Sequence, residues 1–86
     1  MMGIKVETLE EIKNLAEVSL YQQITYKDFI YQRIQIIDEP VIAFFNDTEN
    51  HLIRIFNDGR INIMYCFLDM LQPGVYSYRN DHRKIH

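Results

Sequence analysis

The chain of 86 residues is short and weakly acidic: 48% of its residues are hydrophobic, and 12 Asp and Glu against 9 Lys and Arg give a net charge of −3. The apolar content argues against a disordered chain, the length against two independent cores, and the charge against a dedicated nucleic-acid-coating domain. A single cysteine, Cys66, excludes an internal disulfide framework and favours a reducing, cytoplasmic setting. The first residues do not resemble a signal peptide and no apolar run could span a membrane, so we expect a soluble protein without membrane contact.

The first predicted element is an amphipathic helix that begins near Thr8. Thr8 and Glu11 have the spacing of a capping box, in which each side chain accepts a hydrogen bond from a backbone N–H of the other residue. Apolar or small residues then recur at helical spacing, while charged residues occupy the other side. The proposed buried stripe consists of Leu9, Ile12, Leu15, Ala16 and Ser19.

Residues 24–37 fit two structures. Their apolar residues match a helical stripe, but the segment is rich in β-branched and aromatic side chains, which favour a strand. We interpret residues 29–37 as a strand and the residues before them as irregular or briefly helical.

The rest of the sequence predicts antiparallel strands that are separated by turns at residues 38–40, 46–50 and 57–59. The strands are expected at 41–45, 51–56 and 60–67, with Asn57, Asp58 and Gly59 forming a hairpin turn. Residues 69–74 read as a turn or a single helical turn, and 75–78 as a short edge strand. The sequence therefore predicts an α+β fold, with one N-terminal amphipathic helix packed on an antiparallel β-meander of four to five strands. We expect residues 1–86 to form one domain, with residues 79–86 as a polar, frayed tail.

Such a sheet is long for one covering helix, so part of an apolar face would stay uncovered. The alternating set with Ile53, Ile55, Met64 and Cys66, or the set opposite to it, would supply that face. An uncovered apolar face favours a second protein layer, and we expect a homodimer.

The preferred function is a protein-binding module that acts as an inhibitor, an immunity protein or a regulatory accessory protein by occupying a partner's surface. In size, charge and composition the chain is similar to immunity proteins and phage-encoded inhibitors, with a phage or another mobile element as one source to consider. Acidic side chains, including Asp47 and Glu49, would meet a basic partner, and tyrosines would anchor it. The residues proposed for partner binding are Glu10, Glu11, Glu17, Tyr21, Tyr26 and Tyr31.

The second half of the chain carries a net positive charge and leaves two alternatives open. A nucleic-acid-binding protein would use interleaved aromatic and basic side chains, namely Arg54, Arg60, Tyr78, Arg79, Arg83 and Lys84. A small ribonuclease-like enzyme would combine an acid, a base and phosphate-binding groups from His51, Arg54, Arg60, Tyr78, His82 and Arg83.

We predict no catalytic residues under the preferred reading, and no cofactor or metal site. The three glycines stand apart at positions 3, 59 and 74, so there is no glycine-rich phosphate loop. His82 and His86 have the spacing of two ligands on one helix face, but they lie in the predicted tail.

Overall fold

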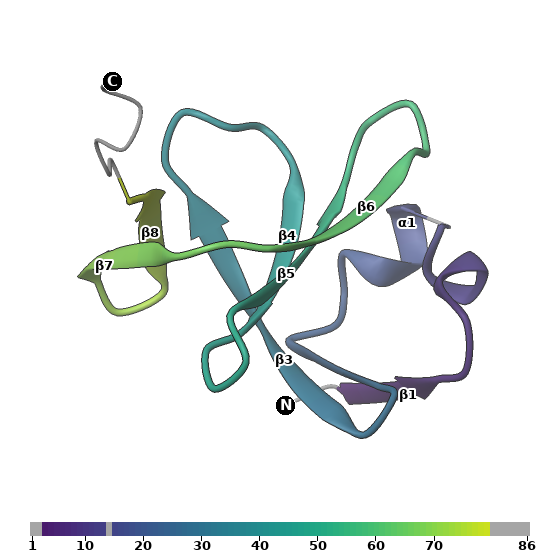
Figure 1. Ribbon diagram of the computed structural model, residues 1–86. Coiled ribbons are helices and arrows are strands. Elements are labelled where there is room, and N and C mark those ends of the chain that lie inside the picture. Colours follow the sequence, from purple (N-terminus) through teal and green to yellow (C-terminus); the bar gives the residue numbers. More distant parts are fainter. Residues whose placement is uncertain (1–2, 14, 80–86) are drawn as a thin grey trace.

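The computed structural model describes residues 3–13 and 15–79, and they form a mostly β structure (Figure 1). Helical structure in this part of the chain is limited to a 3₁₀ turn and one short α-helical turn, η1 (Leu9–Ile12) and α1 (Leu15–Val18). The strands are β1 (Gly3–Val6), β2 (Gln23–Tyr26), β3 (Phe29–Ile36), β4 (Ile42–Asn46), β5 (His51–Ile55), β6 (Ile61–Tyr65), β7 (Leu68–Gln72) and β8 (Val75–Tyr78).

The strands follow the order β1-β2-β3-β4-β5-β6, and the hairpin of β7 and β8 joins the sheet at β3. β1 lies parallel to β2 and β8 parallel to β3, while the other pairs are antiparallel. The N–H of Arg33 donates to Gln22, and those of Gln35 and Ile37 donate to Gly74 and Tyr76. Alternate N–H groups of a strand point to one side, so β2 and β8 share a single edge of β3.

The sheet buries side chains on both faces, because successive residues of a strand point to opposite sides. Phe44 belongs to one cluster, the N-terminal core, and its neighbour Phe45 to the other, the C-terminal core. The N-terminal core contains Val6, Ile12, Val18, Ile24, Tyr31, Phe44, Ile53 and Ile55. The C-terminal core contains Ile34, Ile36, Ala43, Phe45, Leu52 and Leu68.

The predicted N-terminal amphipathic helix is wrong, and so is the α+β class that depended on it. The capping box of Thr8 and Glu11 does form, but it opens only the 3₁₀ turn. Residues 3–6 pair in parallel with β2, so the chain between them is a crossover that must return to the start of β2. This crossover buries Ile12 and Val18, a spacing of six residues that does not match a helical repeat.

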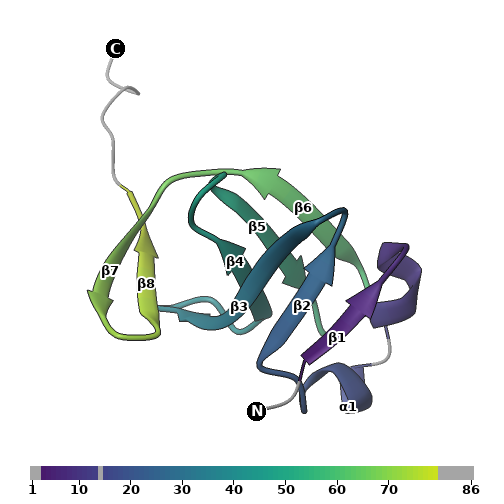
Figure 2. The ribbon, with the colours of Figure 1, turned by 90° about the horizontal axis from the view of Figure 1, so that it is seen from below.

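The β7–β8 hairpin covers the other face, at the opposite end of the molecule from the helical turns (Figure 2). Leu68 is buried in the C-terminal core, and the ring of Tyr76 lies 5.7 Å from that of Phe45. The prediction of a turn at 69–74 is therefore wrong for Asp69–Gln72, which belong to β7. Residues 75–78 form the predicted strand, but it pairs on both sides and is not an edge.

The predicted strands at 29–37, 41–45, 51–56 and 60–67 are confirmed to within a few residues. The sheet is larger than the predicted meander of four to five strands and contains two parallel pairings. Ile53 and Ile55, which were candidates for an uncovered face, are at most 1% exposed. Each face of the central strands is thus covered by a different segment of the same chain.

Candidate functional site

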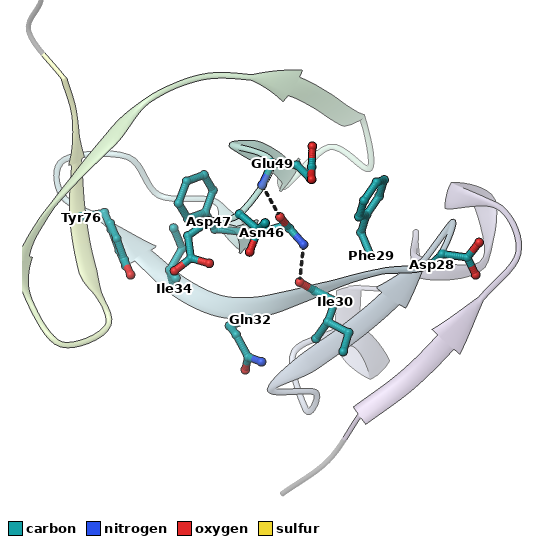
Figure 3. A pocket seen from close by; sticks show the side chains of 11 residues that line it. Asp28, Phe29, Ile30, Gln32, Ile34, Asn46, Asp47, Glu49 and Tyr76 are labelled. Atoms are coloured by element: carbon teal, nitrogen blue, oxygen red, sulfur yellow. Dashed lines mark hydrogen bonds between the residues drawn. The ribbon is translucent and has the colours of Figure 1, made fainter.

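A groove of about 450 Å³ runs along β3, between the β2–β3 turn and the β4–β5 turn (Figure 3). Its apolar lining comes from residues such as Ile34 and Phe45, which are mostly buried in the C-terminal core. Figure 3 shows Asp47 beside Tyr76 toward one end and Asp28 at the other, with Asn46 between them. The groove therefore has an apolar floor and a polar rim.

Asn46 fixes the shape of this groove. It ends β4, is only 8% exposed, and uses both ends of its side-chain amide. Its Nδ2 donates to the carbonyl oxygen of Ile30 on β3 at 2.9 Å, and its Oδ1 accepts from the N–H of Glu49 at 2.7 Å. The side chain thus ties the β4–β5 turn to the neighbouring strand, as the dashed lines of Figure 3 show.

Two turns place the acidic side chains on the rim. Lys27 and Asp28 both have positive φ, 52° and 68°, as the tight turn between two antiparallel strands requires. Aspartate tolerates this conformation better than most residues, so the turn and the acidic group fit together. Asp47 and Glu49 lie in the turn that Asn46 anchors.

The three rim carboxylates, Asp28, Asp47 and Glu49, are exposed. None of them forms an ion pair with a Lys or Arg side chain that the structure describes. No basic residue of the described ranges lines the groove. The described part of the groove therefore carries acidic side chains and no basic ones.

The arginines of the second half are placed differently, because each described one has an acidic partner. Arg54 pairs with Glu39 at 2.8 Å, Arg60 with Asp58 at 2.7 Å and Arg79 with Asp69 at 3.0 Å. Such pairing reduces the positive potential that would attract a phosphate backbone.

Arg54 is the centre of a half-buried polar network. Its guanidinium donates to Glu39, to Asn62 Oδ1 at 3.0 and 3.2 Å, and to the hydroxyl of Tyr78 at 3.1 Å. The Tyr78 hydroxyl in turn donates to Glu39. Burial, followed by this bond to Glu39, raises the pKa of Tyr78 to about 12. The network connects β8 to β5 and β6, so its evident role is to hold the C-terminal hairpin in place.

The structure brings only part of the predicted nucleic-acid set together. Arg54 and Arg60 lie over the ring of Phe56, 5.1 and 4.7 Å from its centre, and Tyr78 bonds to Arg54. Arg79 lies apart, over Phe67. Arg83 and Lys84 fall outside the described residues.

The predicted enzyme site does not converge within the described residues. His51 and Arg54 are three positions apart on β5 and so point to opposite faces of the sheet. The His51 ring packs between the rings of Phe29 and Tyr65, at 5.7 and 6.5 Å. His82, Arg83 and His86 lie outside the described residues, within which no cluster of three metal-ligating side chains occurs.

The residues predicted for partner binding are spread over the crossover and the N-terminal core. Glu10 pairs with Lys13 at 3.3 Å, and Glu11 accepts from the N–H groups of Glu7 and Thr8. Glu17 is exposed. Tyr21 and Tyr26 pack against the core. Tyr31 is 1% exposed, and its burial raises the pKa of its hydroxyl.

Sequence reasoning recognised Asp47 and Glu49 as acidic groups that could meet a partner, but it missed Asp28 and the groove. It also missed a row of aromatic rings at the surface. The ring of Tyr65 lies next to that of His51, and the centre of the Phe67 ring lies 5.3 Å from that of Tyr65. Tyr65 is 64% exposed. The sequence does contain a signal for this row, because large apolar side chains occupy every second position at Ile63, Tyr65 and Phe67.

Comparison with known proteins finds no protein family, no curated protein and no solved structure that matches this chain. Among the described residues no helix is long and apolar enough to cross a membrane.

Proposed function

We propose that this chain is a protein-binding module that captures a basic side chain of a protein partner in the groove along β3. One observation carries the proposal: three exposed carboxylates, Asp28, Asp47 and Glu49, surround an apolar floor and have no described cation as a partner. An arginine or lysine side chain has the matching chemistry, because its aliphatic stem can pack on apolar groups while its charged head meets the carboxylates.

The complementary charges would act on both the rate and the specificity of capture. Acidic groups at a rim attract a basic partner before contact and disfavour acidic competitors. The exposed side chain of Ile30, 51% accessible beside the groove, would add apolar contact around the ion pairs. In this role the protein acts by occupying its partner's surface, as an inhibitor, an immunity protein or a regulatory accessory protein does. The single free cysteine supports a reducing compartment, the cytoplasm.

Nucleic-acid binding is the weaker candidate. The arginines of that set that the structure describes, Arg54, Arg60 and Arg79, already have carboxylate partners, and the acidic groove would repel a phosphate backbone.

Neutralising the groove tests the proposal directly. The variant Asp28→Asn/Asp47→Asn/Glu49→Gln removes its negative charge, and Glu7→Gln/Glu10→Gln/Glu17→Gln removes the same charge from the N-terminal crossover. The probes are a short arginine-bearing peptide and its citrulline counterpart, followed by amide chemical shifts. We expect the arginine peptide to shift the signals of residues 28–30 and 46–49, and to lose affinity about tenfold or more in the groove variant only.

The same variants then serve as baits for proteins from a nuclease-treated lysate. A partner held by the wild type and by the crossover variant, but not by the groove variant, would support the proposal. Equal capture by all three baits would contradict it. Loss of capture in the crossover variant alone would place the site at the residues predicted from the sequence.

A further inference from the structure

The outer edge of β6 has backbone groups that no described strand pairs with. β6 pairs with β5 alone among the described strands. The N–H of Phe56 donates to Arg60 and the N–H of Cys66 donates to Asn50, so the even-numbered residues of β6 bond to β5. In an antiparallel strand the residues between them direct both N–H and C=O away. Ile61, Ile63 and Tyr65 therefore direct their backbone donors and acceptors outward, where they have no partner among the described residues.

The residues of β6 lack the charges, prolines and bulges that protect many natural edge strands. Such strands usually carry a lysine, a proline, a bulge or an inward-pointing charge. β6 contains only Ile61, Asn62, Ile63, Met64 and Tyr65, and its pairing with β5 is regular. Ile63 and Tyr65 are 40% and 64% exposed. The strand therefore combines free hydrogen-bonding groups with apolar side chains that face solvent.

We propose that a second copy of this chain pairs with β6 along this edge, antiparallel and with Ile63 on the two-fold axis. In that register Ile63 faces its own equivalent, and Ile61 faces Tyr65 of the second copy. Each of these facing pairs exchanges both N–H···O bonds. Aromatic and β-branched side chains stabilise such cross-strand pairs. An uncharged strand is also compatible with itself, because no like charges meet across the axis.

A groove beside Ile61 matches the side chain that this register brings to it. The groove, of about 680 Å³, lies between η1 and the start of β6 and is lined by Leu9, Phe56 and Ile61 together with Glu10 and Lys13. Tyr65 of the second copy would arrive at Ile61, with its ring on the apolar lining and its hydroxyl within reach of the charged rim. The two-fold repeats this contact, so each copy both donates a tyrosine and receives one.

The proposal does not depend on the acidic groove, since the two surfaces share no residue. The first test is sedimentation equilibrium of the wild type, Ile63→Lys and Leu71→Lys at concentrations up to about 1 mM. Leu71 is 54% exposed on β7 and serves as the matched control. We expect the wild type and Leu71→Lys to dimerise, and Ile63→Lys to stay monomeric with an unchanged circular dichroism spectrum, because two lysines would meet on the axis.

A crosslink tests the register without relying on a disruptive variant. Facing residues that exchange both bonds have Cα atoms about 5.5 Å apart, which a disulfide can span. Ile63→Cys in a Cys66→Ala background should form an intermolecular disulfide on mild oxidation, whereas Leu71→Cys in the same background should not. A wild type that is monomeric at about 1 mM would overturn the proposal. So would a dimer that Leu71→Lys disrupts and Ile63→Lys does not, or a dimer in which Ile63→Cys fails to crosslink.

Discussion

Carboxylates in two regions of this molecule differ in what surrounds them. On the side of β8, Glu39 accepts hydrogen bonds from Arg54 and Tyr78. The side chains of Glu39 and Arg54, which form the ion pair, are each less than a quarter exposed. Along β3, Asp28, Asp47 and Glu49 project from turns and have no described cation within ion-pair distance. We expect a carboxylate like Glu39 to stabilise the fold, and the carboxylates along β3 to serve the proposed binding of a partner.

The difference teaches that the charge count of a segment does not indicate its binding capacity. The second half of the chain has a net positive charge, but its described arginines are neutralised by acidic neighbours. Binding capacity depends on which charges remain unpaired after folding. Substitutions in the two regions should therefore separate effects on stability from effects on binding.

The largest expected effect on stability is that of Glu39→Ala. Glu39 and Arg54 have side-chain exposures of 24% and 18%, so removing the carboxylate leaves a mostly desolvated guanidinium without its ionic partner. We expect the free energy of unfolding, measured by urea denaturation, to fall by about 1–3 kcal/mol, below the range for fully buried pairs.

The matched control for Glu39→Ala is Asp69→Ala, which breaks the pair of Asp69 with Arg79. Those side chains are 48% and 50% exposed, so water replaces the lost partner and the change should stay within about 0.5 kcal/mol. Equal losses in the two variants would mean that the Arg54 network has no special role in holding β8.

Asn46→Ala should have the next largest effect, because it removes the link between the β4–β5 turn and β3. The substitution leaves the carbonyl of Ile30 and the N–H of Glu49 without their present partner. We expect a loss of about 1–2 kcal/mol in urea denaturation, together with weaker binding of the arginine peptide. Gln35→Ala, at an exposed position on β3, is the control and should change stability by no more than about 0.5 kcal/mol. Unchanged peptide affinity in Asn46→Ala would show that the groove does not depend on this anchor.

The sequence predicted the central strands well because their signals are local. The Asn57-Asp58-Gly59 turn forms with a positive φ of 91° at Gly59, and the run 41–45 becomes a strand buried on both faces. The prediction of an N-terminal helix failed because the structure of residues 7–22 depends on the pairing of β1 with β2. That pairing joins segments about twenty residues apart, and four residues of β1 give a weak local signal. β8 likewise pairs with β3 across nearly half of the chain.

The candidate site was only partly predictable, for the same reason. Its lining comes from residues 28–34, from residues 45–49 and from Tyr76, and these segments meet only in the folded sheet. Asp47 and Glu49 were recognisable as acidic residues of a turn, but nothing local distinguishes them from Glu39. The ion pair of Glu39 with Arg54 crosses fifteen positions, so the sequence does not reveal that this carboxylate is already occupied.

The smallest expected effect is that of Tyr78→Phe, and it depends on pH. Burial and the bond to Glu39 raise the pKa of Tyr78 from 10.0 to about 12, so the fold favours the neutral hydroxyl. At neutral pH the substitution should reduce the free energy of unfolding by about 1 kcal/mol, through the lost hydrogen bonds. Because the folded pKa exceeds the unfolded one, the contribution of Tyr78 is complete below pH 10 and disappears as the pH rises toward 12. The free energies of unfolding of the wild type and the variant should therefore differ below pH 10 and converge above it, as measured by urea denaturation across that range.

Tyrosinate absorbance of the folded proteins gives a second measurement. The variant should lack one late-titrating tyrosine, while Tyr31, whose pKa is also raised, should still titrate late. If the variant instead lacks a tyrosine that titrates near the ordinary pKa of 10.0, and the late-titrating step is unchanged, then Tyr78 ionises freely and its contact with Glu39 does not hold β8.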